Sequence, residues 1–216
     1  MQKILVINPN SNESVTRGLD AALQGWRLLT GIAIECSTLA GGPFGIESDD
    51  DIRAVEPLLV KEISGREDCA AFVIACYSDP GLEICRRANS KPVFGMQQSA
   101  VSAAIAYGGR FGVLALSQRS IDRHLRYLQS MGVRQLLAAE YPLDLSVDAA
   151  ANGSSTLERI IEGGRHLIES EGASVLILGC AGMAAHRRAA EQALGVAVID
   201  PAQVATALAV AALVNR

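Results

Sequence analysis

The sequence has few aromatic residues, only three lysines and no stretch of Lys and Arg longer than two residues. Phe, Trp and Tyr make up 4% of the 216 residues, and 23 acidic side chains against 19 basic ones give a net charge of −4. Proteins that bind nucleic acid usually carry a basic stripe, so nucleic acid is not an expected partner. None of Lys3, Lys61 and Lys91 ends a predicted strand, so no lysine is indicated that would hold pyridoxal phosphate.

Long hydrophobic runs and paired metal-binding motifs are also absent. The longest apolar stretch, residues 204–214, is far shorter than the about 20 residues of a membrane span, so it predicts a buried helix or a subunit contact. The first residues lack the length and cleavage site of a signal peptide, and we expect a cytoplasmic protein without membrane contact. The five cysteines form no C-x-x-C pair and the three histidines stand alone. Neither a metal site nor a disulfide framework is therefore expected.

Short β-branched runs alternate with longer helical patterns along the whole chain. Seven runs predict strands: residues 3–8, 31–37, 70–75, 92–94, 110–116, 174–178 and 196–199. Between them, apolar residues recur every three to four positions, as in Ile121, Leu125 and Leu128, and again across residues 154–170. Three capping residues predict helix starts: Ser11, Asp79 before Pro80, and Asp200 before Pro201. Apolar strands that alternate with helices predict an α/β fold with parallel sheets flanked by helices.

A weak internal repeat divides this pattern into two halves. Residues 72–96 and 175–200 share one layout: an apolar strand, a cysteine (Cys76, Cys180), an Arg-Arg pair and a second Val-rich strand. Upstream, residues 3–8 match residues 110–116. Any two βαβ units look alike, but that likeness does not explain a cysteine at the same strand end in both. We expect two pseudo-symmetric lobes, approximately residues 1–96 plus 200–216 and residues 97–199, with an active site in the cleft between them.

The two strand-end cysteines are the candidate catalytic residues. Ligands of open parallel sheets bind beyond the carboxyl ends of the strands, and Cys76 and Cys180 both lie at such ends. A helix N-terminus after each cysteine would favour a thiolate and bring the thiol pKa near the working pH. Two thiols that face one cleft suit proton transfer at a carbon acid, with one thiolate removing the proton and the other thiol returning it to the opposite face. Either cysteine alone is as well explained by packing, and Cys36, Cys69 and Cys85 are interpreted as structural.

Five segments of the chain carry a further pattern: ILVINPNSNESVT (residues 4–16), GPFGIES (42–48), IACYSDPGL (74–82), LGCAGM (178–183) and VIDP (198–201). Together they resemble the hydantoin and allantoin racemases of the aspartate/glutamate racemase superfamily. The resemblance covers nearly the whole chain. It implies an Asp/Glu racemase-like fold and a cofactor-independent isomerase that inverts C5 of 5-substituted hydantoins, with Cys76 and Cys180 as the acid/base pair. It also implies a small hydantoin-like substrate and, together with the apolar residues 204–214, a homo-oligomer.

The resemblance further implies which residues hold the substrate. They are Asn8 and Asn10 after the first strand, Ile46, and the turns after each cysteine, which contain Tyr77, Ser78, Ala181 and Gly182. Two candidate positions depart from the family pattern: Gln98 replaces a carboxylate, and Ala115 and Leu116 replace two threonines, so that Ser117 is the next polar residue. These departures affect the choice of substrate more than the chemistry.

Other functions stay open from the sequence. Within the superfamily they are racemisation of allantoin, racemisation of an acidic amino acid, and a maleate-type isomerisation. The neighbours of the cysteines, Tyr77-Ser78 and Ala181-Gly182, favour a neutral ring over a carboxylate. A module that binds a small ligand without turnover is the non-enzymatic alternative. It is motivated by the departures at Gln98 and residues 115–116, while the presence of both cysteines counts against it.

Overall fold

Each half of the chain forms a four-stranded parallel sheet in the computed structural model, which describes residues 2–215. The first sheet has the order β2-β1-β3-β4 and contains β1 (Lys3–Asn8), β2 (Ala33–Thr38), β3 (Ala71–Ile74) and β4 (Val93–Gly95). The second has the order β6-β5-β7-β8 and contains β5 (Phe111–Ala115), β6 (Leu137–Pro142), β7 (Val175–Leu178) and β8 (Ala197–Ile199). The two orders are equivalent, which confirms the α/β fold of two pseudo-symmetric parallel sheets.

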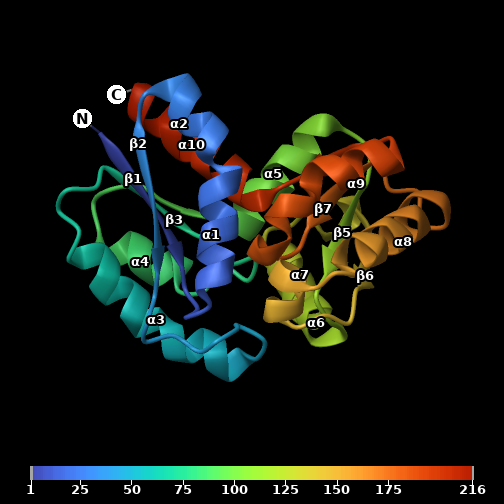
Figure 1. Cartoon of the computed structure of the whole chain (residues 1–216), viewed down its shortest axis with the longest axis horizontal. Coiled ribbons are helices and arrows are strands. Elements are labelled where there is room, and N and C mark those ends of the chain that lie inside the picture. Colours follow the sequence, from blue (N-terminus) through green and yellow to red (C-terminus); the bar gives the residue numbers. More distant parts are fainter. Residues whose placement is uncertain (1, 216) are drawn as a thin grey trace.

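Helices flank both sheets (Figure 1). In the first half these are α1 (Glu13–Ala22), α2 (Gln24–Thr30), α3 (Asp49–Ser64) and α4 (Leu82–Ala88). The next helix, α5 (Met96–Tyr107), follows β4 and packs on β7 and β8 of the second sheet. In the second half these are α6 (Gln118–Ser130), α7 (Val147–Asn152), α8 (Thr156–Glu169) and α9 (Arg187–Leu194), with 3₁₀ helices η1 (Arg134–Leu136) and η2 (Ala181–His186). The last helix, α10 (Pro201–Val214), returns to the first half and packs on α5, β1, β3 and β4. No helix among residues 2–215 is long and apolar enough to span a membrane.

The apolar segment 204–214 forms most of α10. One side of this helix is buried, in agreement with the prediction of a buried helix. Ala205, Ala209 and Leu213 are buried, whereas Leu208 and Val214 are exposed. A single cluster of buried side chains includes residues of both halves, among them Val15 of α1 and Val147 of α7. The two sheets therefore share part of one hydrophobic core.

The strand β6 is missing from the sequence prediction, which found the other seven strands. Its residues, LAAEYP, include a glutamate and a proline and show no alternation of apolar and polar residues. A proline is compatible with a strand only at a sheet edge or a strand end, and β6 is the edge strand of its sheet. Glu140 of β6 bonds His124 of α6, a pairing that the sequence analysis did not predict.

Two of the three predicted helix starts need correction. Asp200 caps α10 with Pro201 in the first turn, as predicted. The first helix is capped by Asn12 rather than Ser11. Asp79 does not cap the helix that follows it, because α4 begins after Gly81. Its carboxylate instead accepts hydrogen bonds from the backbone N–H groups of Gln97 and Gln98, both at 2.9 Å, at the start of α5.

Candidate active site

The two cysteines predicted to be catalytic line one cavity. Cys76 lies two residues beyond the end of β3, and Cys180 lies two residues beyond the end of β7. These strands occupy equivalent places in their sheets, so the pseudo-symmetry brings the two thiols together from opposite walls. The cavity has a volume of about 30 Å³, which is room for one or two water molecules. A ring substrate therefore requires the walls to move apart.

Both halves of the molecule contribute to the cavity wall. Besides the thiols, the lining residues are Asn10, Val15, Ile46, Ala75, Tyr77, Ser78, Leu116, Ser120, Arg123, His124, Val147, Gly179 and Ala181. Five of the predicted substrate-binding residues are therefore at the cavity: Asn10, Ile46, Tyr77, Ser78 and Ala181. The wall combines apolar side chains with a few polar groups, as is usual for sites that bind small molecules.

Burial holds both thiols in the neutral form. It raises the pKa of Cys76 to about 11, although the backbone N–H of Ser78 and the charge of Arg123 lower it. Burial likewise raises the pKa of Cys180 to about 12; the backbone N–H of Gly182 lowers it, and the proximity of Cys76 adds to the rise. The prediction that helix N-termini bring these pKa values near the working pH is wrong, since desolvation outweighs the backbone donors.

The backbone after each cysteine also differs from the prediction. Cys180 caps the 3₁₀ helix η2, and its Sγ accepts the backbone N–H of Gly182 at 3.4 Å. Gly182 thus reaches the thiol through its backbone. Cys76 is followed by a turn, in which the N–H of Asp79 donates to the carbonyl of Cys76, before α4 begins at Leu82. Local N–H groups, rather than the ends of α-helices, are the donors nearest the sulfurs.

Asn8 does not line the cavity but makes hydrogen bonds to Asn10, which does. The Asn8 amide donates to Asn10 Oδ1 at 2.9 Å, and Asn8 Oδ1 accepts the backbone N–H of Asn10 at 3.2 Å. Both side chains are buried, but only Asn10 reaches the cavity wall. Asn8 therefore positions the asparagine that the substrate would meet.

Gln98 and Ser117 lie beside the cavity rather than on its wall. The side chain of Gln98 accepts a hydrogen bond from Arg86 at 2.7 Å. Ser117 caps α6 and neighbours Ser120, with 3.3 Å between their hydroxyl oxygens. The structure thus separates these two residues from the thiols.

A loop of the first half closes the cavity against the second half. Ile46 of this loop lines the cavity, and Glu47 Oε1 accepts the backbone N–H of Val147 at 2.8 Å. A Cβ atom on Gly45 would lie 2.9 Å from Cβ of Val147. Glycine at this position allows the loop to approach α7 closely.

Three cavity residues of α6 were missed by the sequence analysis. Ser120, Arg123 and His124 occur at helical spacing, so they share one face of α6. His124 Nδ1 lies 2.8 Å from Glu140 Oε2, and its ring meets that of Tyr77 edge-on at 4.8 Å. The repeat offered a signal, because α6 follows β5 as α1 follows β1. By that equivalence, residues after β5 are expected at the cavity, as Asn10 is after β1.

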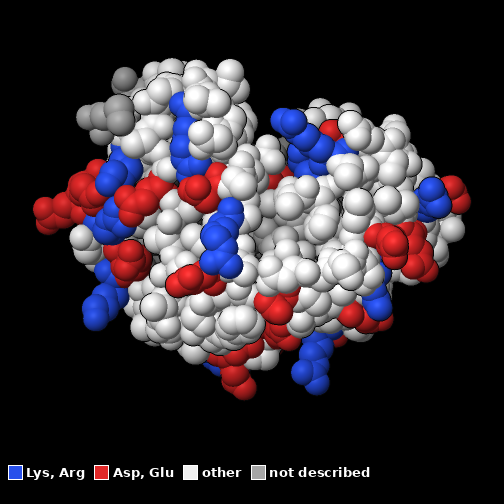
Figure 2. Space-filling model, viewed as in Figure 1, with Lys and Arg blue, Asp and Glu red and all other residues white. Residues whose placement is uncertain are grey.

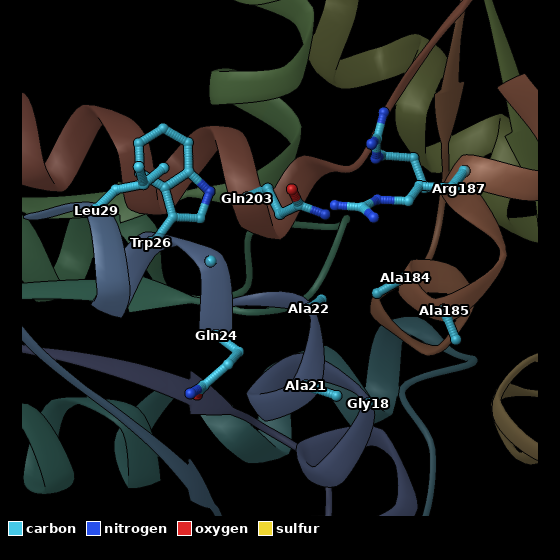
Figure 3. A pocket seen from close by; sticks show the side chains of 12 residues that line it. Gly18, Ala21, Ala22, Gln24, Trp26, Leu29, Ala184, Ala185, Arg187 and Gln203 are labelled. Carbon is cyan, nitrogen blue, oxygen red and sulfur yellow. The ribbon is translucent and has the colours of Figure 1, made fainter.

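A larger hollow of about 610 Å³ lies away from the thiols, between α1 and α2 on one side and η2, α9 and α10 on the other. Figure 3 shows Trp26 and Leu29 on one wall and Arg187 and Gln203 on the other.

Charges of both signs are interspersed on the face that Figure 2 shows. Among residues 2–215, no group of three or more His, Cys, Asp or Glu lies together as a metal site would require.

Comparisons with known proteins agree with this architecture. Residues 4–209 match the sequence profile of the Asp/Glu/Hydantoin racemase family. Two similar relatives are a hydantoin racemase of Paenarthrobacter aurescens (32% identity, 96% of this chain and 89% of the relative) and one of Pseudomonas sp. strain NS671 (34% identity, 92% and 80%). Among solved structures, allantoin racemase from Klebsiella pneumoniae superimposes with a TM-score of 0.93 at 29% identity, covering 100% of this chain and 88% of that chain.

Proposed function

Because the chain belongs to the Asp/Glu/Hydantoin racemase family, and is thus an isomerase, we propose that it inverts C5 of 5-substituted hydantoins. The observation that carries this proposal is the convergence of Cys76 and Cys180 on one cavity from equivalent strand ends. The reactive centre would lie between the two lobes, residues 1–96 plus 200–216 and residues 97–199.

In the proposed reaction, the thiolate of one cysteine removes the C5 proton and the thiol of the other donates a proton to the opposite face of the ring. The electron pair passes to the adjacent ring carbonyl, so the intermediate is an enolate. The proximity of the two sulfurs disfavours a second ionisation, so the reactive form is one thiolate with one thiol. Reversal of these roles gives the opposite enantiomer, and the step needs no cofactor.

Isotope exchange tests the proposal. Single enantiomers of benzyl- and isobutylhydantoin and of allantoin would be incubated with the protein in D₂O, while optical rotation and the C5–H signal are followed. Inversion with deuterium incorporation is the expected result. Exchange without inversion would contradict the two-base step. The absence of exchange with every ring would contradict the function and favour an acidic amino acid, maleate or a ligand-binding module.

Allantoin racemisation is the second candidate. The observation that favours it is the superposition on allantoin racemase from Klebsiella pneumoniae over the whole chain. Allantoin is itself a hydantoin with a ureido group at C5, so the same two thiols would act. Relative kcat/KM values for allantoin and the other rings would decide between the candidates.

Substitution of each thiol tests the catalytic pair. We expect Cys76→Ser and Cys180→Ser each to lower racemisation by about 10²- to 10⁴-fold, the usual contribution of a general acid or base. Cys36→Ser is the matched control, since Cys36 lies on β2 outside the cavity wall. Full racemisation by both single variants would show that the thiols are not the bases.

We also propose that the protein is a homo-oligomer. The support is a group of large apolar side chains that stay exposed in the single chain, among them Leu28, Leu29 and Tyr107.

A further inference from the structure

Arg123 is a largely covered cation whose guanidinium makes only long contacts. Its side chain is 9% exposed and lines the cavity that contains both thiols. Its Nε makes no hydrogen bond within the described chain. Its other contacts are long: 3.3 Å to Ser120 Oγ, 3.4 Å to the carbonyl of Glu47, and 3.8 Å to the carboxylate of Asp49.

A fully engaged arginine in the same molecule shows the difference. Arg66 contacts Glu35 at 2.8 Å and Asp68 at 3.0 Å, both within hydrogen-bond distance. Buried charges are normally paired in this way, because an unpaired charge is costly to bury. The donors of Arg123 are therefore only weakly engaged by its present contacts, among them the carboxylate of Asp49.

The cavity itself supplies no counter-charge. Of the described residues on its wall, none is Asp or Glu, and Arg123 alone is permanently charged. Ser120 and His124 lie on the same face of α6 and also line the cavity. The second half thus presents a polar wall with a fixed positive charge beside the place where the ring would bind.

We propose that Arg123 binds a carboxylate on the C5 substituent, so that hydantoins with an acidic side chain are the preferred substrates. This inference rests on the proposed function. A ring whose C5 contacts both thiols has its C5 substituent free to extend toward the cavity wall. The planar guanidinium matches a carboxylate in two parallel hydrogen bonds. Opening of the cavity would release Arg123 from its long contacts with Glu47 in the loop and with Asp49 at the start of α3.

The test compares two substrates of the same shape. 5-(2-Carboxyethyl)hydantoin and 5-(2-carbamoylethyl)hydantoin differ only in a carboxylate against an amide. We expect the wild type to prefer the carboxylate in kcat/KM, and Arg123→Met to lower kcat/KM for the carboxylate on the order of 10- to 100-fold. For the amide, kcat/KM should fall by a smaller factor, which reports the loss of the Arg123 charge that lowers the pKa of Cys76. Arg126→Met is the matched control, because it removes the same charge from α6 at a side chain that is 64% exposed and lies off the cavity wall.

Two results would overturn the inference. An equal loss for both substrates would show that Arg123 acts on the reaction rather than on the substituent. Equal kcat/KM values of the wild type for the two substrates would show that the substrate carboxylate does not contribute to recognition. A binding measurement separates this inference from the racemase proposal. Calorimetry would measure the affinity of both hydantoins for the Cys76→Ser variant and for the Cys76→Ser, Arg123→Met double variant. Carboxylate binding that depends on Arg123 would support the anion site even without turnover, and binding independent of Arg123 would refute it.

Discussion

The acid–base behaviour of the two thiols follows from where each residue is buried. With its pKa raised to about 11 or 12, each thiol carries its proton at neutral pH. Since the attacking base must be a thiolate, kcat/KM should rise about tenfold per pH unit below that pKa. We therefore expect activity to increase from pH 7 to pH 9.5 in a profile measured with one enantiomer. A flat profile over this range would contradict a base with a raised pKa.

Asp79 is a second residue whose role the fold determines. It has a φ of 45°, and its carboxylate caps α5 through two backbone N–H groups. Loss of such a cap costs about 0.5–2 kcal/mol. We expect Asp79→Ala to lower the free energy of unfolding by about that amount in urea denaturation. An unchanged unfolding midpoint would show that the cap contributes nothing.

Gly95 provides an independent test of the same cap. A Cβ atom at this position would overlap the Asp79 carboxylate. Gly95→Ala should therefore displace the cap and destabilise the wild type, but destabilise the Asp79→Ala variant less. Equal destabilisation in both backgrounds would contradict the contact.

At the scale of elements, the sequence was informative where a periodic pattern or a repeat existed. Seven strands were predicted from short β-branched runs and the helices α6 and α8 from apolar spacing. The repeat predicted that Cys76 and Cys180 occupy equivalent places. The edge strand β6 was missed because Glu140 and Pro142 break any strand pattern. Because Glu140 was not assigned to a strand, its pairing with His124 could not be predicted. Arg123 was missed because spacing alone does not distinguish the solvent-facing residues of a helix from those that face a site.

The loop that carries Ile46 and Glu47 should control access to the thiols. Glu47→Ala removes the acceptor for the Val147 N–H, a hydrogen bond of about 0.5–1.5 kcal/mol. Because a ring enters only when this contact opens, Glu47→Ala should lower KM about 3- to 10-fold with little change in kcat. Glu47→Gln keeps an acceptor while removing the charge, so it should retain the wild-type KM in steady-state assays. A comparable decrease in KM for Glu47→Gln would assign the effect to the charge instead.

For the whole molecule, duplication explains how one fold presents two similar groups to two faces of a substrate. The equivalent sheets place the same strand end on either side of the cavity. The surrounding walls are not equivalent, since the first half offers Asn10 and Ile46 and the second offers Ser120, Arg123 and His124. The symmetric part therefore suits the proton transfers, and the asymmetric part suits recognition of the rest of the substrate.

Assembly is the remaining property of the whole molecule. Leu28 and Leu29 of α2 are 78% and 82% exposed, and Tyr107 at the end of α5 is 66% exposed. Neighbouring Trp26 lines the hollow of Figure 3 and is the single tryptophan of the chain. Exposed apolar surface of this kind marks association sites. We expect light scattering to give a multiple of the chain mass for the wild type, and Leu28→Glu with Leu29→Glu to reduce it.

The control is Ile84→Glu, which adds one such charge at an exposed apolar residue of α4, away from α2 (Figure 1). This variant should keep the wild-type mass. The fluorescence of Trp26 should shift to longer wavelength only in the α2 variant, because dissociation would expose the hollow to water. A monomeric wild type, or a mass that survives both leucine substitutions, would show that α2 is not the contact. Loss of the assembly with full racemisation would further show that one chain contains a complete site, as the cavity lined from both halves predicts.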